Sequence, residues 1–234
     1  YGNEDPMYIL AGLPFIAPDY SSAWLLKDVQ MEYLQEKFAK KGLMILYTAP
    51  WPGQGFYTKF PVNSVSDFKG KKLRIYSTAT QQMGSMLGFN ATILPFAEIP
   101  QAFSTGLIEA LFTSPQTGID IQAWDNTKHF TYAGAIFSKN AVVVTKKAFN
   151  ALSKDDQSNM LAAAKRAELR GWEMSAETTK KQIDILKKNG MSSKNAPDEV
   201  ISKMKSIGLE MMKNWRSKAS PEANAVLDRY LSMR

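Results

Sequence analysis

The residue with the clearest chemical potential is Arg74, which lies in the strand-like segment KKLRIYS (71–77). A guanidinium is costly to bury unless it pairs with an anion, and its planar set of N–H donors matches a carboxylate or a phosphate. Arg74 therefore predicts a binding site for an organic anion. Strand alternation allows a second interpretation, in which Leu73 and Ile75 point inward and Arg74 points to solvent. The residues alone favour neither interpretation.

Aromatic, amide and hydroxyl side chains flank Arg74 in the sequence. They precede its segment, end it, or follow the last strand expected in the central block, and they are Trp51, Gln54, Phe56, Tyr76, Thr113, Ser114, Thr117 and Trp124. Because ligands of open α/β sheets bind at the carboxyl ends of strands, we expect these side chains to converge on one crevice. Taken one at a time, the aromatic residues are more typical of a hydrophobic core, and the hydroxyl residues of ordinary strand ends.

The sequence offers little for catalysis or for a metal. It has no cysteine and one histidine, His129, which excludes a thiol nucleophile, cysteine-ligated zinc and multi-histidine metal sites. It also lacks a P-loop, a GxGxxG motif, an HExxH motif and a GxSxG motif. We therefore expect no enzymatic activity, no cofactor and no metal site. The alternative is an α/β-cleft enzyme that acts on a small organic anion.

The net charge of +7 does not point to nucleic acid. The lysines occur in pairs near expected helix ends, without a block of five or six like charges, which is typical of solvated helix surfaces. No apolar run is long enough to span a membrane. The first residues, YGNEDPMYIL, lack the basic start and cleavage site of a signal peptide, so we expect none in this sequence.

Hydrophobic periodicity predicts an α/β fold. A helix is expected over 21–40 and a strand covered on both faces over 43–50, followed by a turn-rich segment over 51–60. The central block alternates strand and helix, with strands over 71–77, 91–96 and 109–114 and helices over 79–88 and 97–106. Strands joined by short helices indicate βαβ units and a mostly parallel sheet. Two further strands are expected within 129–137 and 140–149.

The last third of the sequence is expected to be helical. One helix begins after a Ser153 N-cap and ends at Gly190, and at about 1.5 Å per residue it would span roughly 50 Å. That length exceeds what one small lobe needs, so the helix is expected to bridge two lobes. Two more helices begin at Pro197 and Pro221, where proline suits the first turn.

Several of these segments together resemble the extracytoplasmic solute-binding proteins of TRAP transporters, the DctP type. The match includes DFKGKKLR (67–74) and PFAEIPQAFSTGLIEA (95–110), with LPF (13–15), GLMILY (42–47) and WPGQGFYTK (51–59) before them. The resemblance extends through the long helix to the C-terminus. It implies a two-lobe clamshell with mostly parallel sheets, hinge strands and a lobe-spanning helix. Lobe I would comprise 1–51 plus 140–175, and lobe II 52–139 plus 176–234.

The resemblance also implies a function. Arg74 would clamp a substrate carboxylate, and Phe96 and Thr113 would line the pocket. The protein would be a monomeric periplasmic receptor that delivers a small organic acid to the membrane subunits of a TRAP permease, without catalysis.

Three departures from the family pattern qualify these expectations. Gln54 stands where many relatives have a second arginine, so we expect a ligand with fewer negative charges. Thr113 stands where many relatives have asparagine, so we expect less amide recognition of the ligand. A monocarboxylate fits best, for example a 2-oxo acid or one with an aromatic or branched body. Whether a metal ion bridges ligand and protein stays open. The family's first strand, helix and strand have no counterpart before Tyr1, so the first lobe is expected to lack sheet partners.

Overall fold

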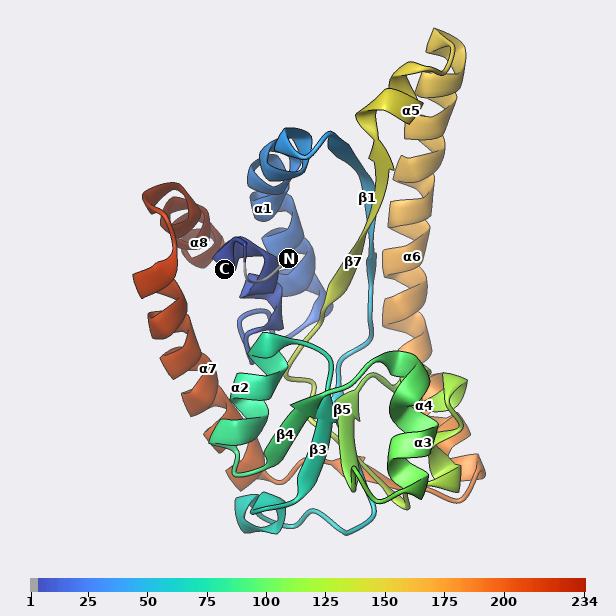
Figure 1. The fold of residues 1–234 in the computed structure, drawn as a ribbon, viewed down its shortest axis with the longest axis vertical. Helices are drawn as coiled ribbons and strands as arrows, with labels where there is room; N and C mark the ends of the chain where they lie inside the picture. The colour runs from blue at the N-terminus through green and yellow to red at the C-terminus, as the bar shows by residue number, and fades with distance from the viewer. Residues whose placement is uncertain (1–3) are drawn as a thin grey trace.

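The structure is a computed structural model that describes residues 4–234 (Figure 1). Residues 1–3, which fall within the range predicted for lobe I, lie outside the described residues. The described elements form two regions, one around a two-stranded sheet and one around a six-stranded sheet, and the long helix α6 (Lys154–Lys188) runs beside both (Figure 1). The two-lobe α/β architecture is therefore confirmed.

The first region contains three of the predicted elements. The helix over 21–40 is confirmed as α1 (Tyr20–Lys40), and the Asp19 side chain caps it by accepting from the Ser22 amide at 2.7 Å. β1 (Leu43–Pro50) pairs antiparallel with β7 (Lys139–Thr145), and the 3₁₀ helix η1 (Pro6–Gly12) packs against α1.

The prediction that 43–50 is covered on both faces holds in part. β1 contacts the helices α1 and α6, and its residues are all buried or half-buried, although only Ile45 and Thr48 are fully buried. One edge of β1 has no strand partner, because β7 is its single strand neighbour.

The second region is built on six strands in the order β4-β3-β5-β2-β6-β8. β3 pairs parallel with β4 and β5, and β6 pairs parallel with β8, whereas β2 pairs antiparallel with both of its neighbours. The strands are β2 (Gly55–Thr58), β3 (Lys72–Ile75), β4 (Asn90–Ile93), β5 (Ala110–Thr113), β6 (His129–Tyr132) and β8 (Ser192–Asn195). The short helices between them are α2 (Thr78–Met86), α3 (Ile99–Ser104) and α4 (Pro115–Asp120), and α5 (Lys146–Asn150) follows β7.

The βαβ order of the central block is thus confirmed. Two strands differ from the sequence prediction. β2 lies in the segment expected to be turn-rich, and β8 lies in what was expected to be a connection between helices. Both are short and gain their strand geometry from pairing with distant segments, β5 and β6 for β2 and β6 for β8.

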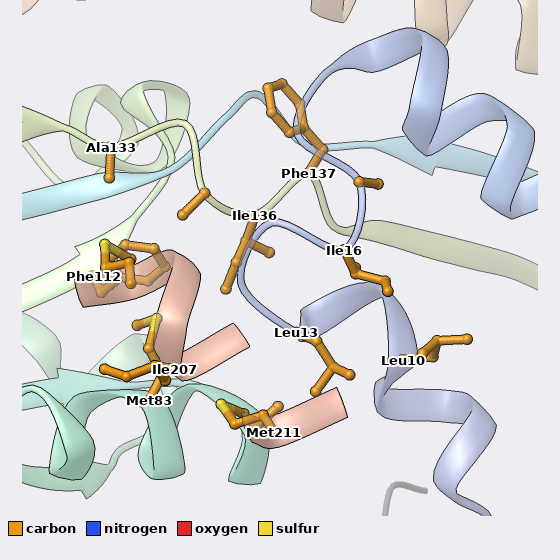
Figure 2. Close-up of a cluster of buried hydrophobic side chains, with 14 of the residues drawn as sticks. Leu10, Leu13, Ile16, Met83, Phe112, Ala133, Ile136, Phe137, Ile207 and Met211 are labelled. Carbon is orange, nitrogen blue, oxygen red and sulfur yellow. The ribbon is translucent and has the colours of Figure 1, made fainter. Parts of the chain in front are cut away.

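Side chains cover both faces of the six-stranded sheet. On one face, Phe56 and Phe112 join a core that continues through α2 and α7 (Asp198–Lys218) to η1. Figure 2 shows part of this core, which includes Phe112, Met83 and Met211 together with Leu13 of the first region. On the other face, a second cluster is centred on rings and aliphatic side chains that include Tyr57, Leu111, Phe130 and Leu186. Residues of β2 and β5 are therefore buried whichever side of the sheet they face, whereas the edge strands β4 and β8 stay largely exposed.

The C-terminal helices bind both regions together. α6 (Lys154–Lys188) begins after the Ser153 N-cap, as predicted, and contacts β1 in one region and α4 and β8 in the other. α7 contacts α2 and η1, and α8 (Pro221–Met233) contacts α1. The predicted lobe division stays a proposal, with one amendment: α8 packs on the first region, because Tyr230 donates its hydroxyl to the Ile16 carbonyl at 2.8 Å.

Glu168 fastens the long helix to the first region. Its Oε1 accepts from the Thr48 amide at 2.8 Å and the Thr48 hydroxyl at 2.7 Å, and its Oε2 accepts from the buried Lys27 ammonium at 3.4 Å. Replacing Glu168 by alanine is expected to lower the free energy of unfolding by about 2–3 kcal/mol, because the Thr48 amide and hydroxyl both lose this acceptor and Lys27 keeps only the Asp28 carboxylate.

Urea denaturation measures this difference. Glu173→Ala on the same helix is the matched control, because Glu173 forms only an exposed pair with Arg170 at 3.0 Å. We expect less than about 0.5 kcal/mol for the control. Equal losses in the two variants would contradict the role given to Glu168.

Candidate functional site

A cavity of about 640 Å³ lies where the two regions meet. Its lining includes the ends of β3 and β5 and the start of α4 from one region, and η1, α1, β1 and β7 from the other. Eight of the ten predicted site residues line it, and these are Trp51, Gln54, Arg74, Tyr76, Phe96, Thr113, Ser114 and Thr117. The neighbouring parallel strands β4, β3 and β5 bring most of them to one edge of the sheet, as expected for an open α/β sheet.

Arg74 is a buried cation without a carboxylate partner in the described chain. It is 5% exposed, and its Nε and Nη2 donate to the Leu94 carbonyl at 3.1 and 2.9 Å, while Nη1 makes no hydrogen bond with residues 4–234. Burial lowers the pKa of the Arg74 guanidinium, although arginine remains charged at neutral pH. The arrangement leaves one end of the guanidinium for an anion.

The alternative in which Arg74 points to solvent is wrong. Strand alternation does separate it from Leu73 and Ile75, which are 0% exposed and belong to the larger core. The opposite face is covered as well, however, because α3 contributes Ile99, Ala102 and Phe103 to the second core cluster, which also holds Leu111, the β5 neighbour of Arg74. The Arg74 side chain, which points away from the larger core, therefore points into the cavity.

An uncharged hydrogen-bond chain lies beside the arginine. Tyr76 donates its hydroxyl to Gln54 Oε1 at 2.7 Å, and Gln54 Nε2 donates to the Ser138 hydroxyl at 3.0 Å. Burial raises the pKa of Tyr76 to about 12, so the phenol stays protonated at neutral pH. These hydrogen bonds hold the Gln54 amide in one orientation, and the three side chains present polar but uncharged groups to the cavity.

The hydroxyl residues differ in how far they are already engaged. Ser114 caps α4, since its Oγ accepts from the Thr117 amide at 3.2 Å and lies 3.0 Å from the Thr117 hydroxyl. Thr113 ends β5 and makes no side-chain hydrogen bond with the residues that the structure describes. Thr113 is therefore the hydroxyl most available to a ligand, whereas Ser114 and Thr117 first hold the helix start.

The aromatic predictions divide into two groups. Trp51 and Phe96 line the cavity, with Trp51 Nε1 donating to Asn140 Oδ1 at 3.3 Å and the Phe96 side chain 53% exposed. Phe56 and Trp124 do not line it, so their assignment to the pocket is corrected.

The reason differs for each of these two rings. Phe56 lies on the face of β2 that packs into the larger core, with its ring centroid 4.9 Å from that of Phe68 and 4.8 Å from that of Phe112. Trp124 lies in the short helix η4 (Ala123–Asp125) and packs against the second core cluster.

Sequence reasoning missed the residues that the first region contributes. Lys139, Gln30, Ser138 and Asn140 all line the cavity, and Asp120 lines it from the end of α4. Lys139 is the first residue of β7 and directly follows the segment 133–138, which connects β6 of the six-stranded sheet to β7 of the two-stranded sheet. Lysine next to an expected strand is usually exposed, so no local pattern separates Lys139 from the many surface lysines of this chain.

Within residues 4–234, no group of three or more histidine, cysteine, aspartate or glutamate side chains could hold a metal ion. A search of the same residues finds no helix with the length and apolar character needed to cross a membrane.

Comparisons with known proteins agree with this geometry. The sequence profile of the DctP family, "Bacterial extracellular solute-binding protein, family 7", matches residues 1–218. A crystal structure of DctP7, a Bordetella pertussis extracytoplasmic solute receptor binding pyroglutamic acid, is 37% identical with a TM-score of 0.95 and covers 98% of this chain and 76% of that one. A marine metagenome TRAP solute binding protein, solved with co-purified pyroglutamate, is 32% identical with a TM-score of 0.93 and covers 99% and 76%.

More distant relatives are longer than this chain. A solute-binding protein of Chromohalobacter salexigens is 25% identical over 187 residues, which make up 76% of this chain and 55% of the relative. The chain thus spans a little over half the length of such curated relatives.

Proposed function

Since the chain belongs to the bacterial extracellular solute-binding proteins of family 7, the receptors of TRAP transporters, we propose that it binds a small organic monocarboxylate in the cavity at Arg74. The observation that supports this proposal is the buried Arg74 guanidinium, which lacks a carboxylate partner in the described chain. An anion with two oxygens would complete its hydrogen bonds and balance its charge.

The uncharged neighbours of Arg74 favour a single negative charge on the ligand. Gln54 and Tyr76 offer an amide and a neutral phenol, and Thr113 a hydroxyl. Pyroglutamate is the ligand we propose first, because two similar receptors bind it and because it combines one carboxylate with a compact uncharged ring. Trp51 and Phe96 would cover that ring.

The proposed cellular role follows the family. The receptor would act as a monomer in the periplasm, close its two lobes around the ligand, and deliver it to the membrane subunits of a TRAP permease. No chemical step, cofactor or nucleic acid is part of this proposal. Arg74, Tyr76, Gln54 and Thr113 would orient the ligand, and Ser114 and Thr117 would support them.

Mass spectrometry of small molecules released from the purified protein tests the proposal. We expect pyroglutamate or another small monocarboxylate, released unchanged, and a rise in melting temperature when pyroglutamate is added back. A ligand without a carboxylate would contradict the proposal, and conversion of the added pyroglutamate to a product would favour an enzyme.

A further inference from the structure

A second cation, Lys139, faces the same cavity from the other region of the molecule. It is the first residue of β7 and pairs with Pro50 of β1, whereas Arg74 belongs to β3 of the six-stranded sheet. Between them lies the uncharged chain of Tyr76, Gln54 and Ser138, of which Ser138 directly precedes Lys139. The two cations therefore lie at opposite ends of a neutral polar strip.

The Lys139 ammonium has only a neutral partner in the described chain. Its Nζ donates to Gln30 Oε1 at 2.8 Å, and no carboxylate of residues 4–234 lies within ion-pair distance. The nearby Lys27 takes two carboxylates, with Asp28 at 2.6 Å and Glu168 at 3.4 Å. Burial, together with the positive charge of Lys27, lowers the pKa of Lys139 to about 8, as expected for an ammonium that is poorly compensated.

Gln30 is held in a position that serves Lys139. The residue is 1% exposed, and its Nε2 lies 3.3 Å from the Met7 sulfur, a weak acceptor. Because an ammonium can only donate, the amide must present its oxygen to Lys139. One bond to this amide leaves two of the three ammonium donors for a group in the cavity.

We infer that Lys139 is a specificity-determining ligand contact, which donates a hydrogen bond to an uncharged acceptor oxygen at the end of the ligand away from the carboxylate held by Arg74. This inference rests on the proposed function and narrows it. It selects monocarboxylates that carry a carbonyl or similar oxygen across the ring or chain, such as a lactam, over those with a purely hydrocarbon body.

The inference predicts which ligands a change at Lys139 affects. Lys139→Met removes the donor and keeps most of the side chain's length. We expect it to weaken pyroglutamate binding roughly ten- to hundredfold, the typical effect of losing a charge-assisted hydrogen bond. Cyclopentanecarboxylate has the same ring size and carboxylate but no ring amide, so its affinity should change by less than about threefold.

Isothermal titration calorimetry of both probes measures this selectivity. The matched control is Lys194→Met, which makes the same chemical change at an exposed lysine whose Nζ also donates to a neutral amide, Asn63 Oδ1, at 2.9 Å. This control should bind both probes as the wild type does. If the wild type does not bind cyclopentanecarboxylate measurably, the ring amide is shown to be needed for binding. The pyroglutamate affinity of Lys139→Met then tests by itself whether Lys139 contacts that amide.

The outcomes separate this inference from the proposed function. If the wild type binds pyroglutamate and Lys139→Met weakens it less than threefold, or weakens both probes equally, the role of Lys139 is wrong while the receptor proposal stands. If the wild type binds neither probe, the pyroglutamate assignment fails and the Lys139 inference fails with it.

Discussion

Replacing Arg74 by methionine is expected to weaken pyroglutamate binding by about 2–5 kcal/mol, or roughly thirtyfold to several thousandfold. The guanidinium is 5% exposed and has only the Leu94 carbonyl as a partner among residues 4–234, so a bound carboxylate would meet it with little competition from water. Methionine keeps an extended side chain but offers no donor. The bound carboxylate would then be desolvated without a counter-charge, which is where most of the loss arises.

Calorimetry gives the affinity, and urea denaturation of the ligand-free protein separates binding from folding. We expect no loss of stability in the Arg74 variant, because the substitution removes a buried charge that has no carboxylate partner among residues 4–234. Arg74→Lys should lie between wild type and methionine, since it keeps the charge but loses the planar fork. Arg170→Met, at an exposed arginine paired with Glu173, is the matched control. Unchanged pyroglutamate affinity in Arg74→Met would refute the carboxylate clamp.

Phe56→Ala is expected to lower the free energy of unfolding by about 3–5 kcal/mol, because it opens a void in the core of the six-stranded sheet. Phe56 is 0% exposed, and its ring lies among those of Phe68, Phe89 and Phe112, at centroid distances of 4.9, 5.8 and 4.8 Å. The residue is central to the packing that positions β2 and β5, and it does not line the cavity.

Phe96→Ala is expected to weaken ligand binding and to leave stability nearly unchanged, in contrast to Phe56→Ala. The Phe96 side chain is 53% exposed at the cavity, so its loss should change stability by less than about 0.5 kcal/mol. We expect it to reduce ligand affinity roughly three- to tenfold through lost apolar contact. Urea denaturation and calorimetry of both variants check the contrast. A Phe56→Ala protein of normal stability but weak affinity would restore the pocket assignment of Phe56.

The sequence was sufficient where structure depends on local periodicity. Apolar spacing placed α1, the alternating strands and helices of the central block, and α6 with its Ser153 cap. It failed for β8, whose short polar segment SSKN becomes a strand only because β6 lies beside it. Propensity over four residues is too weak to specify pairing with a segment about sixty residues earlier.

The candidate site shows the same division. The strand and helix pattern was enough to predict that Arg74, Tyr76, Thr113 and Ser114 lie toward the ends of neighbouring parallel strands. Residues at the carboxyl ends of such strands share one edge of the sheet. Which side chains cover each face of that sheet depends on tertiary packing. In the folded protein Arg74 is buried, although strand alternation alone would have allowed it to be exposed, and the Phe56 side chain packs in the larger core.

Lys139 is the clearest case of what the sequence could not determine. Nothing in its local sequence distinguishes it from a surface lysine, yet it lines the cavity and donates to the buried Gln30 amide, which lies 109 positions earlier in the chain. The surroundings of a charged side chain depend on segments that fold together from distant parts of the chain. Local pattern therefore determined the elements and the anion-binding edge of the sheet, and tertiary packing determined which side chains face the ligand.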